Sequence, residues 1–241
     1  MTIPSRITTL VWDLDGTIID SMAVMQEVLA AILPAYGREA PTREVIAQHI
    51  HGSMEDIINN SLGGIDRDEL DTIYHNYMLA QHQHYELVGH HVYPDALELM
   101  QQAHEAGKHQ IIVTNRNHKG MELGSPHAIV ASSGLGGYVS DIFCGDDCER
   151  RKPEPEVLGS YLADHGIMPS QLLVIGDQFV DAQFSSNLGC RSVLVTHYDK
   201  RIPHLDQLTP AARRSMTVVP TLGVVKVPLP IQVVPACQPV L

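Results

Sequence analysis

The sequence predicts an α/β fold: a three-layer, doubly wound parallel sheet with a small helical domain inserted after the first strand. Three observations lead to this prediction. Four short apolar runs each end in a polar loop, helical patterns separate the later runs, and one long stretch after the first run contains no strand pattern. Continuous apolar runs are typical of parallel strands, because helices bury such a sheet on both faces.

The strands and helices of the sheet-forming part are predicted from local patterns. The apolar, β-branched runs that predict strands cover residues 7–12, 110–113, 172–175 and 192–195. Helical periodicity between them covers residues 95–106, 154–165 and 181–188, the last closed by a glycine. Residues 217–219 are a candidate edge strand. Prolines recur beyond it, so residues 226–241 are expected to form an extended Pro-rich tail.

The stretch without strands is predicted to be a helical insert. Its helical patterns cover residues 21–33, 42–48, 53–60 and 66–83, and in the last of these Leu70, Ile73, Tyr74 and Tyr77 have the spacing of a buried stripe. We therefore expect a core from residues 1–20 and 92–225 and a cap from residues 21–91. A cap that follows the first strand's loop would cover the carboxyl edge of the sheet, where ligands of such folds bind.

Polar residues at the ends of the predicted strands are the candidate site. Asp13 and Asp15 follow the first strand, Thr114 ends the second, and Asp177 follows the third, with Asp181 four residues further on; Lys152 lies in RKPEPE. The carboxyl ends of parallel strands share one edge, so these groups are expected to converge. Each residue alone has an ordinary structural explanation, since Asp-Gly is a common turn and Asp181 could simply cap its helix.

The order of these segments resembles a known family. DLDGT, IIVTNR, RKPEP and VIGDQFVD are similar to the four motifs of the haloacid dehalogenase-like hydrolase superfamily, most of whose members are phosphatases. The match spans nearly all of residues 8–196, and the insert resembles that superfamily's helical cap. SDIFCGDDCERRKPEPEVL and GDQFVDAQFSSNLGCRSVLVT also resemble phosphoglycolate-phosphatase-like members. The resemblance implies a Rossmann-type core with this helical cap.

The resemblance also implies roles for the candidate residues. Asp13 would be the nucleophile that forms an aspartyl-phosphate, and Asp15 the general acid and base. Mg2+ would be held by Asp13, Asp177 and the Asp15 backbone carbonyl, with Asp181 in support. Phosphoryl oxygens would bind Lys152, Thr114 and Asn115. The expected activity is therefore Mg-dependent hydrolysis of small phosphomonoesters, of the phosphoglycolate or sugar-phosphate type.

Two alternatives remain open beside that activity. A phosphomutase would use the same aspartates, and a non-catalytic regulatory module would use the same scaffold, although the intact motif residues argue against lost chemistry. Substrate choice is expected to depend on a cap loop that contains His49, His51, Gly52 and Ser53.

Gln178 and Arg116 depart from the residues common at their positions. Arg116 could reach substrate anions or be solvated, and solvation is favoured.

Composition limits the expected classes of binding partner and the expected cellular location. The 28 acidic residues against 16 basic ones give a net charge of −12, which argues against nucleic acid or an anionic membrane as main partner. The sequence has no export signal and no apolar run that could span a membrane, so a cytoplasmic monomer or homodimer that binds a small phosphorylated metabolite is expected. Cys144 and Cys148 form a lone C-x3-C, a weak zinc signal, and ordinary reduced thiols are favoured.

Overall fold

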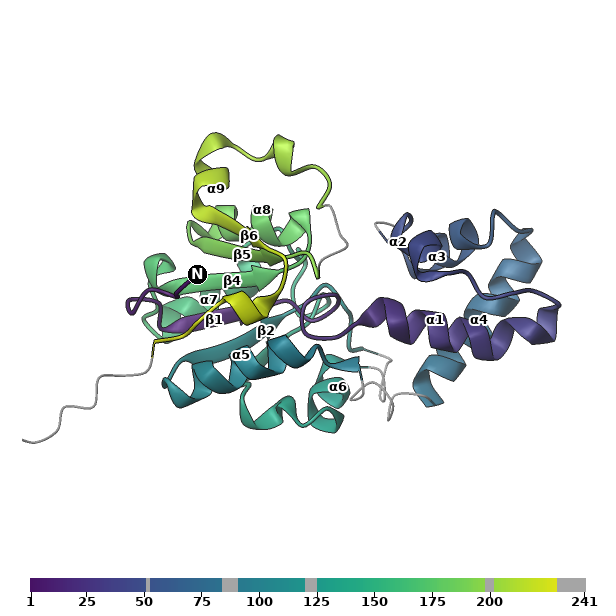
Figure 1. The fold of residues 1–241 in the computed structure, drawn as a ribbon, viewed down its shortest axis with the longest axis horizontal. Coiled ribbons are helices and arrows are strands. Elements are labelled where there is room, and N and C mark those ends of the chain that lie inside the picture. The colour runs from purple at the N-terminus through teal and green to yellow at the C-terminus, as the bar shows by residue number, and fades with distance from the viewer. Residues whose placement is uncertain (51–52, 84–90, 120–124, 198–201, 229–241) are drawn as a thin grey trace, which may run out of the picture.

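The computed structural model divides the chain into an α/β core and a helical lobe that lie side by side (Figure 1). It describes residues 1–241 apart from 51–52, 84–90, 120–124, 198–201 and 229–241. The helical lobe is formed by residues 21–83, and the remaining described residues form the core. Within the described residues, every helix is too short or too polar to cross a membrane.

The core is built on a six-stranded parallel sheet, as the apolar runs predict. The strand order is β3-β2-β1-β4-β5-β6, and each neighbouring pair is parallel. The strands are β1 (Thr9–Trp12), β2 (His109–Val113), β3 (Asp141–Phe143), β4 (Leu172–Gly176), β5 (Arg191–Val195) and β6 (Met216–Val219). The candidate edge strand at residues 217–219 is thus confirmed as β6.

Alternate residues of the strands bury opposite faces of the sheet, and helices cover both. On one face Val11 is in register with Ile111 and Val174. These side chains pack with Leu158 of α7 (Glu156–Asp164) and Phe184 of α8 (Phe179–Leu188). The other face packs against α5 (Pro94–Glu105) and α6 (Pro126–Ser132). Burial on both faces explains why consecutive residues of the central strands, such as Ile111, Ile112 and Val113, are apolar rather than alternating with polar ones.

Three core helices are close to the predicted positions: α5 (Pro94–Glu105), α7 (Glu156–Asp164) and α8 (Phe179–Leu188). The core also contains α6 (Pro126–Ser132) and α9 (Pro210–Ser215). The prediction for α7 starts two residues too early, because the proline-rich segment RKPEP precedes the helix. Short 3-10 turns connect the elements at Leu135–Gly137, Pro169–Gln171, Leu205–Gln207 and Leu222–Val224.

The helical lobe contains the four predicted helices. They are α1 (Ser21–Ile32), α2 (Arg43–Ala47), α3 (Met54–Ser61) and α4 (Arg67–Gln83), with a 3-10 turn at Leu33–Tyr36. The predicted stripe of α4 faces inward: Ile73 and Tyr77 are fully buried, Leu70 is nearly so, and Tyr74 packs against the same cluster. Because α1 follows the loop of β1 directly, the lobe stands beyond the carboxyl edge of the sheet (Figure 1).

Three elements of the core have no counterpart in the prediction: β3, α6 and α9. β3 has only three residues, all partly exposed, so it lacks the apolar run of the other strands. Near the C-terminus, Lys226 bridges Thr2 at the edge of the core, and its backbone exchanges hydrogen bonds with Met1 and Ile3. Most of the predicted tail, residues 229–241, lies outside the described residues.

Candidate active site

Four buried charged side chains meet where β1 and β4 end, and we call them the floor: Asp13, Lys152, Asp177 and Asp181. Their exposed fractions are 8%, 5%, 2% and 1%. Asp13 directly follows β1, and its backbone N–H donates to the carbonyl of Ile175 in β4. The parallel pairing of the two central strands therefore places the first and last motifs together, although more than 160 residues separate them along the chain.

Lys152 holds the floor together. Its Nζ lies 2.6 Å from Asp13 Oδ1 and 2.8 Å from Asp181 Oδ1, and both contacts are shielded from water. Burial alone would lower the pKa of this ammonium, but the charges and hydrogen bonds of the two carboxylates outweigh burial and raise it. Lys152 is therefore a permanent cation at this point of the site.

Asp181 has two functions in the floor at once. One carboxylate oxygen, Oδ2, accepts hydrogen bonds from the backbone N–H groups of Asp177 and Gln178 and so caps the N-terminus of α8. The other oxygen, Oδ1, accepts from Lys152. The capping explanation for Asp181 is thus confirmed, and its support of a metal site stays a prediction.

The loop after β1 is packed closely against the floor. Gly16 has φ = +81°, and a Cβ at this position would lie 2.4 Å from Asp177 Oδ2, so only glycine fits. The fully buried Thr17 hydroxyl lies 3.4 Å from Asp13 Oδ2 and 3.3 Å from Asp177 Oδ1. The segment DLDGT therefore supplies the Asp13 carboxylate, the tight turn at Gly16, and a Thr17 hydroxyl that lies near both Asp13 and Asp177.

The floor carries more negative than positive charge. Burial raises the pKa of Asp13 well above its usual value; Lys152 lowers it again, while Asp181 and Asp177 raise it further. Carboxylate oxygens of Asp13, Asp177 and Asp181 lie within 4.8 Å of one another, in a group able to hold a metal ion. Three hard oxygen donors around one ammonium leave an unbalanced charge that a divalent cation would neutralise, and oxygen ligands suit Mg2+. The Asp15 carboxylate is not part of this group among the described residues.

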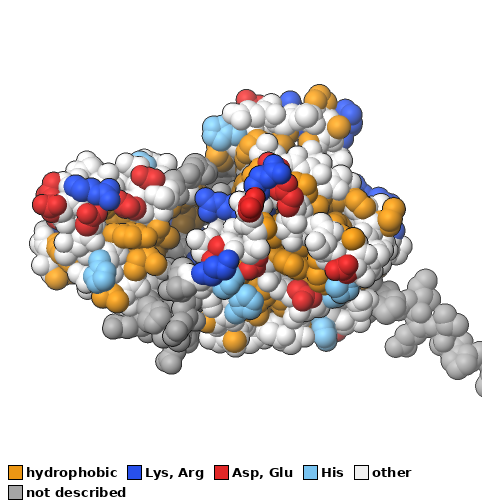
Figure 2. Space-filling view, turned by 180° about the vertical axis from the view of Figure 1, so that it is seen from behind, with side chains coloured by type: hydrophobic (Ala, Val, Ile, Leu, Met, Phe, Trp, Pro, Cys, Tyr) orange, Lys and Arg blue, Asp and Glu red, His pale blue; other side chains and the backbone are white. Residues whose placement is uncertain are grey.

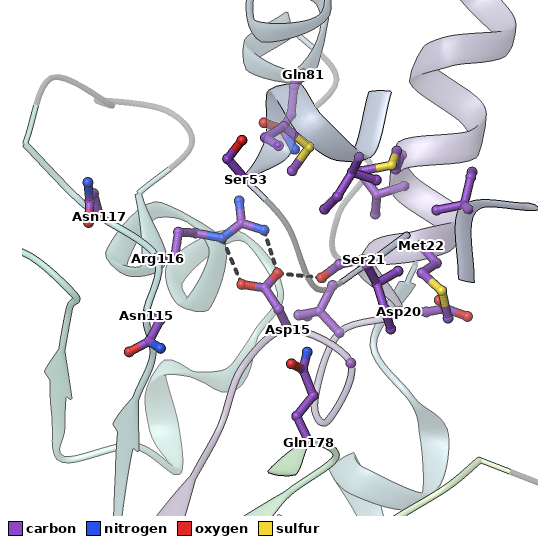
Figure 3. Close-up of a pocket in the computed structure, with 18 of the residues that line it drawn as sticks. Asp15, Asp20, Ser21, Met22, Ser53, Gln81, Asn115, Arg116, Asn117 and Gln178 are labelled. Atoms are coloured by element: carbon purple, nitrogen blue, oxygen red, sulfur yellow. Dashed lines mark hydrogen bonds and ion pairs between the residues drawn. The ribbon is translucent and has the colours of Figure 1, made fainter. Parts of the chain in front are cut away.

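Asp15 belongs to a second cluster at the edge of the pocket, which we call the rim: Asp15, Ser21 and Arg116. The Arg116 Nε lies 3.0 Å from Asp15 Oδ2, and its terminal nitrogen pairs with Oδ1. The Ser21 hydroxyl at the start of α1 donates to the same Oδ1 (Figure 3). Burial raises the pKa of Asp15, but the charge and hydrogen bonds of Arg116, with that of Ser21, outweigh it and hold the pKa below its usual value.

This contact corrects one interpretation of the sequence. Solvation was the favoured environment for Arg116, yet its side chain is only 15% exposed and is paired with Asp15. The two residues are 101 positions apart, so no local pattern could have revealed the pair. Ser21 was likewise not foreseen, although a hydroxyl beside the second motif aspartate, at the start of a predicted helix, was the available signal.

Thr114 and Asn115 directly follow β2, next to Arg116. The Thr114 hydroxyl is buried and accepts a hydrogen bond from the Arg116 N–H, and its binding of phosphoryl oxygens stays a prediction. The Asn115 amide donates to the backbone carbonyl of Lys152. Asn115 therefore positions the segment that carries Lys152 rather than offering that donor to the pocket.

A pocket of about 830 Å3 opens between the core and the helical lobe. Its core side is polar and includes Asp15, Arg116, Lys152, Asp177 and Gln178. Its lobe side is largely apolar, lined mainly by Met22, Val24, Met25, Ile46, Ile50, Met54, Ile57, Tyr74, Tyr77 and Met78. The space-filling view shows the two lobes with a hollow between them and basic side chains beside it on the core (Figure 2).

The predicted cap loop is described only in part. Ser53 lines the pocket and caps α3, in a reciprocal pair of hydrogen bonds with Asp56. His49 is half-buried and, although described, is not among the residues that line the pocket. His51 and Gly52 lie outside the described residues. Selectivity through this loop stays a prediction.

Comparisons with known proteins agree with the geometry. A family model described as haloacid dehalogenase-like hydrolase matches residues 10–195. The chain is 28% identical over 198 residues to the phosphoglycolate phosphatase of Aliivibrio fischeri, covering 79% of this chain and 85% of that one. It is 29% identical over 208 residues to the phosphoglycolate phosphatase of Rhodobacter capsulatus, covering 85% and 90%.

Solved structures share the fold. A predicted phosphoglycolate phosphatase from Haemophilus somnus superimposes with a TM-score of 0.69 at 17% identity, covering 91% of this chain and 96% of that one. A haloacid dehalogenase superfamily hydrolase from Geobacter sulfurreducens superimposes with a TM-score of 0.68 at 18% identity, covering 90% and 94%. Both cover the core and the helical lobe together.

Proposed function

The chain belongs to the haloacid dehalogenase-like hydrolases and is an enzyme of the phosphatase type, and we propose that it hydrolyses small phosphomonoesters with Mg2+, through an aspartyl-phosphate on Asp13. The observation that carries this proposal is the contrast between the neighbouring aspartates. Asp13 lies in the buried floor, paired with Lys152, whereas Asp15 lies two residues away on the pocket rim. The buried Asp13 is placed to attack the phosphorus atom, and Asp15 on the rim is placed to reach the leaving group.

In the first step an Asp13 oxygen attacks the phosphorus atom while the bond from phosphorus to the ester oxygen breaks. Lys152 Nζ, already 2.6 Å from Asp13 Oδ1, is in place to stabilise the charge on the phosphoryl oxygens. The Thr114 hydroxyl supplies a further donor on the same edge of the sheet. Asp15 gives its proton to the departing alkoxide, so that an alcohol leaves.

In the second step water attacks the phosphorus atom of the aspartyl-phosphate. Asp15, now a carboxylate, takes the proton from that water, and the bond from Asp13 to phosphorus breaks. Inorganic phosphate leaves and Asp13 is restored as a carboxylate. The pair with Arg116 lowers the pKa of Asp15 and so keeps it ionised, which is the form that this second, basic role requires.

The carboxylates of Asp13 and Asp177, supported by Asp181, would hold Mg2+, which when bound offsets the repulsion between an anionic nucleophile and an anionic phosphate. The rest of the negative charge of the floor and the phosphate would be balanced by cationic side chains of the protein. Within the floor, Lys152 is paired with Asp13 and Asp181. Arg116 faces the pocket from the rim.

The acid role of Asp15 requires its ion pair to open. While Arg116 is paired with it, Asp15 is held as a carboxylate and has no proton to give. A substrate with a second anionic group next to its phosphate would draw the guanidinium away and release Asp15. This requirement favours small phosphomonoesters that carry a second anionic group, the class to which phosphoglycolate belongs, over phosphates of uncharged sugars.

The test is a screen of the purified chain against phosphorylated metabolites, including phosphoglycolate and sugar phosphates, together with p-nitrophenyl phosphate. Release of inorganic phosphate is expected with Mg2+ and not after chelation, and Mg2+ should restore it whereas Ca2+ should inhibit. Full turnover in metal-free buffer would contradict the metal assignment. Transfer of the phosphoryl group between sugar positions without release would favour the mutase.

A further inference from the structure

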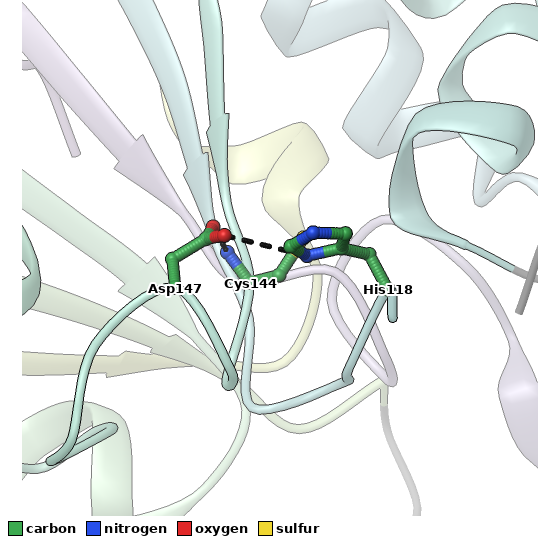
Figure 4. A group of neighbouring side chains, drawn as sticks. All are labelled: His118, Cys144 and Asp147. Carbon is green, nitrogen blue, oxygen red and sulfur yellow. Dashed lines mark hydrogen bonds and ion pairs between the residues drawn. The ribbon is translucent and has the colours of Figure 1, made fainter. Parts of the chain in front are cut away.

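A second group of metal-binding side chains lies outside the pocket, between the loops that follow β2 and β3. It comprises His118, Cys144 and Asp147, whose donor atoms all lie within 4.8 Å of one another (Figure 4). The three residues supply a nitrogen, a sulfur and an oxygen. We propose that this group binds a zinc-class divalent metal ion that ties the two loops together.

The distances between donor atoms suit such an ion. His118 Nδ1 lies 3.3 Å from Asp147 Oδ1. Tetrahedral zinc with ordinary bond lengths places its ligand atoms about 3.3–3.6 Å apart. A further histidine, His127 at the start of α6, has its Nδ1 4.0 Å from the Cys144 sulfur and is a candidate for a fourth ligand.

One ring nitrogen of this group has carboxylates beside it but no aligned hydrogen bond. His118 Nδ1 is buried, and carboxylate oxygens of Asp146 and Asp147 lie 3.1 and 3.3 Å from it, but within the described part of the chain neither contact is aligned as a hydrogen bond. A buried polar atom without an aligned hydrogen bond is costly. A metal ion bound by that nitrogen and by an Asp147 oxygen would supply the missing interaction.

The surrounding backbone already orients these ligands. Asp147 Oδ2 accepts from the Cys144 N–H at 2.6 Å, which leaves Oδ1 facing His118. The Asp146 carboxylate accepts from the N–H groups of His118 and Lys119 at 3.0 and 2.9 Å and so clamps the loop after β2. Such outer contacts are the usual means of fixing metal ligands.

A mixed set of imidazole, thiol and carboxylate favours zinc over Mg2+ or Ca2+, which prefer oxygen alone. Cys144 is fully buried, and burial together with Asp147 and Asp146 raises the pKa of its thiol to about 12, so the metal-free side chain stays protonated. On binding, the S–H bond breaks, the proton passes to solvent and the sulfur bonds to the metal. Asp147 is exposed, which leaves the ion a route in.

The position of the group links it to the pocket. The Gly145 N–H, one residue after Cys144, donates to the Arg116 carbonyl at 2.8 Å, and His118 is two residues beyond Arg116. A bound ion would therefore fix the loop that carries Asn115 and Arg116. This effect is distinct from the chemistry at Asp13.

The test uses the full chain, stripped with a chelator and titrated with Co2+ in excess Mg2+, which occupies the oxygen-only site. Co2+ bound to a thiolate gives a sulfur-to-metal charge-transfer band in the near ultraviolet. One equivalent is expected in the wild-type chain, with no band in Cys144→Ser and an affinity at least about tenfold lower in His118→Asn. Cys148→Ser and Cys190→Ser are matched controls that should keep the band.

A second readout protects the result against misfolding. Zn2+ should raise the melting temperature of the wild-type chain and of Cys148→Ser, but not that of Asp147→Asn, whose side chain keeps its shape. Circular dichroism establishes that each variant is folded. Absence of the band in the wild-type chain, its survival in Cys144→Ser, or its loss in Cys148→Ser would overturn the proposal.

Discussion

The floor and the rim of the pocket contain neighbouring aspartates in opposite environments. Asp13 lies among buried carboxylates, and its pKa is raised; Asp15, two residues on, pairs with Arg116, and its pKa is lowered. The side chains of the floor pair Lys152–Asp181 are 3% and 1% exposed, whereas those of Arg116 and Asp15 are 15% and 31% exposed. The same residue type thus has two opposite environments, which are set by its partners rather than by its position in the sequence.

The largest expected effect comes from removing the floor's cation. Lys152→Met leaves the buried carboxylates of Asp13 and Asp181 without their partner, and breaking a buried pair in this way typically costs about 3–5 kcal/mol. Turnover should fall below detection, and urea unfolding in metal-free buffer should show the lost stability. Lys226→Met, at an exposed lysine, is the control and should change neither. Near wild-type stability in Lys152→Met would show that the floor is not a charge-dependent cluster.

The rim can be separated from the floor by its pH dependence. In Arg116→Gln the pKa of Asp15 should rise, because burial remains and the opposing charge is gone; such a charge is typically worth about 1–3 pKa units. The alkaline limb of kcat/KM, which requires a protonated Asp15, should then move to higher pH. Arg151→Gln removes another arginine of the pocket and should alter KM without moving that limb. An unmoved limb in Arg116→Gln would contradict the assignment of Asp15 as the acid.

Stability should respond to pH with opposite signs at the two aspartates. The folded-state pKa of Asp15 is depressed, so its contribution is present above the unfolded pKa of about 4 and is lost as pH falls. The folded-state pKa of Asp13 is raised, so metal-free stability declines as pH rises from about 4 towards that pKa. At neutral pH without metal, Asp13→Asn should therefore melt higher than wild type and Asp15→Asn lower, each by a few degrees. Equal shifts of the melting temperature in both variants would contradict the opposite pKa changes of Asp13 and Asp15.

The smallest expected effects concern the predicted selectivity loop. His49→Ala or His51→Ala should change selectivity among metabolites by about tenfold while hydrolysis of p-nitrophenyl phosphate changes less. Ser53→Ala is a useful companion, because Ser53 lines the pocket. Uniform losses on every substrate would indicate that the lobe does not select substrates.

Local patterns were sufficient to predict most of the fold. Each central strand is an uninterrupted apolar run because the sheet is buried on both faces, and the stripe through Ile73 and Tyr77 marks a helix that packs inward. β3 was not predicted because its three residues are partly exposed and it lies near the edge of the sheet, where neighbours rather than its own sequence define it.

The convergence of the floor residues was predictable from the sequence, whereas the contacts of Asp15 were not. Asp13, Lys152, Asp177 and Asp181 do converge, because parallel strands bring their carboxyl ends together. The pair between Asp15 and Arg116 depends on how two distant loops meet. In the same way Cys144 lies near His118 and His127 rather than acting with Cys148, which the C-x3-C spacing could not indicate.

The most direct test of the division between floor and rim is to trap the intermediate. Asp15→Asn, exposed to p-nitrophenyl phosphate with Mg2+ and quenched in acid, should accumulate one phosphoryl adduct on the peptide that contains Asp13, because the activated ester needs no acid and hydrolysis of the adduct lacks its base. Asp13→Asn should give neither adduct nor turnover. An adduct on a serine, histidine or cysteine, or an Asp13→Asn chain that still turns over, would contradict the account.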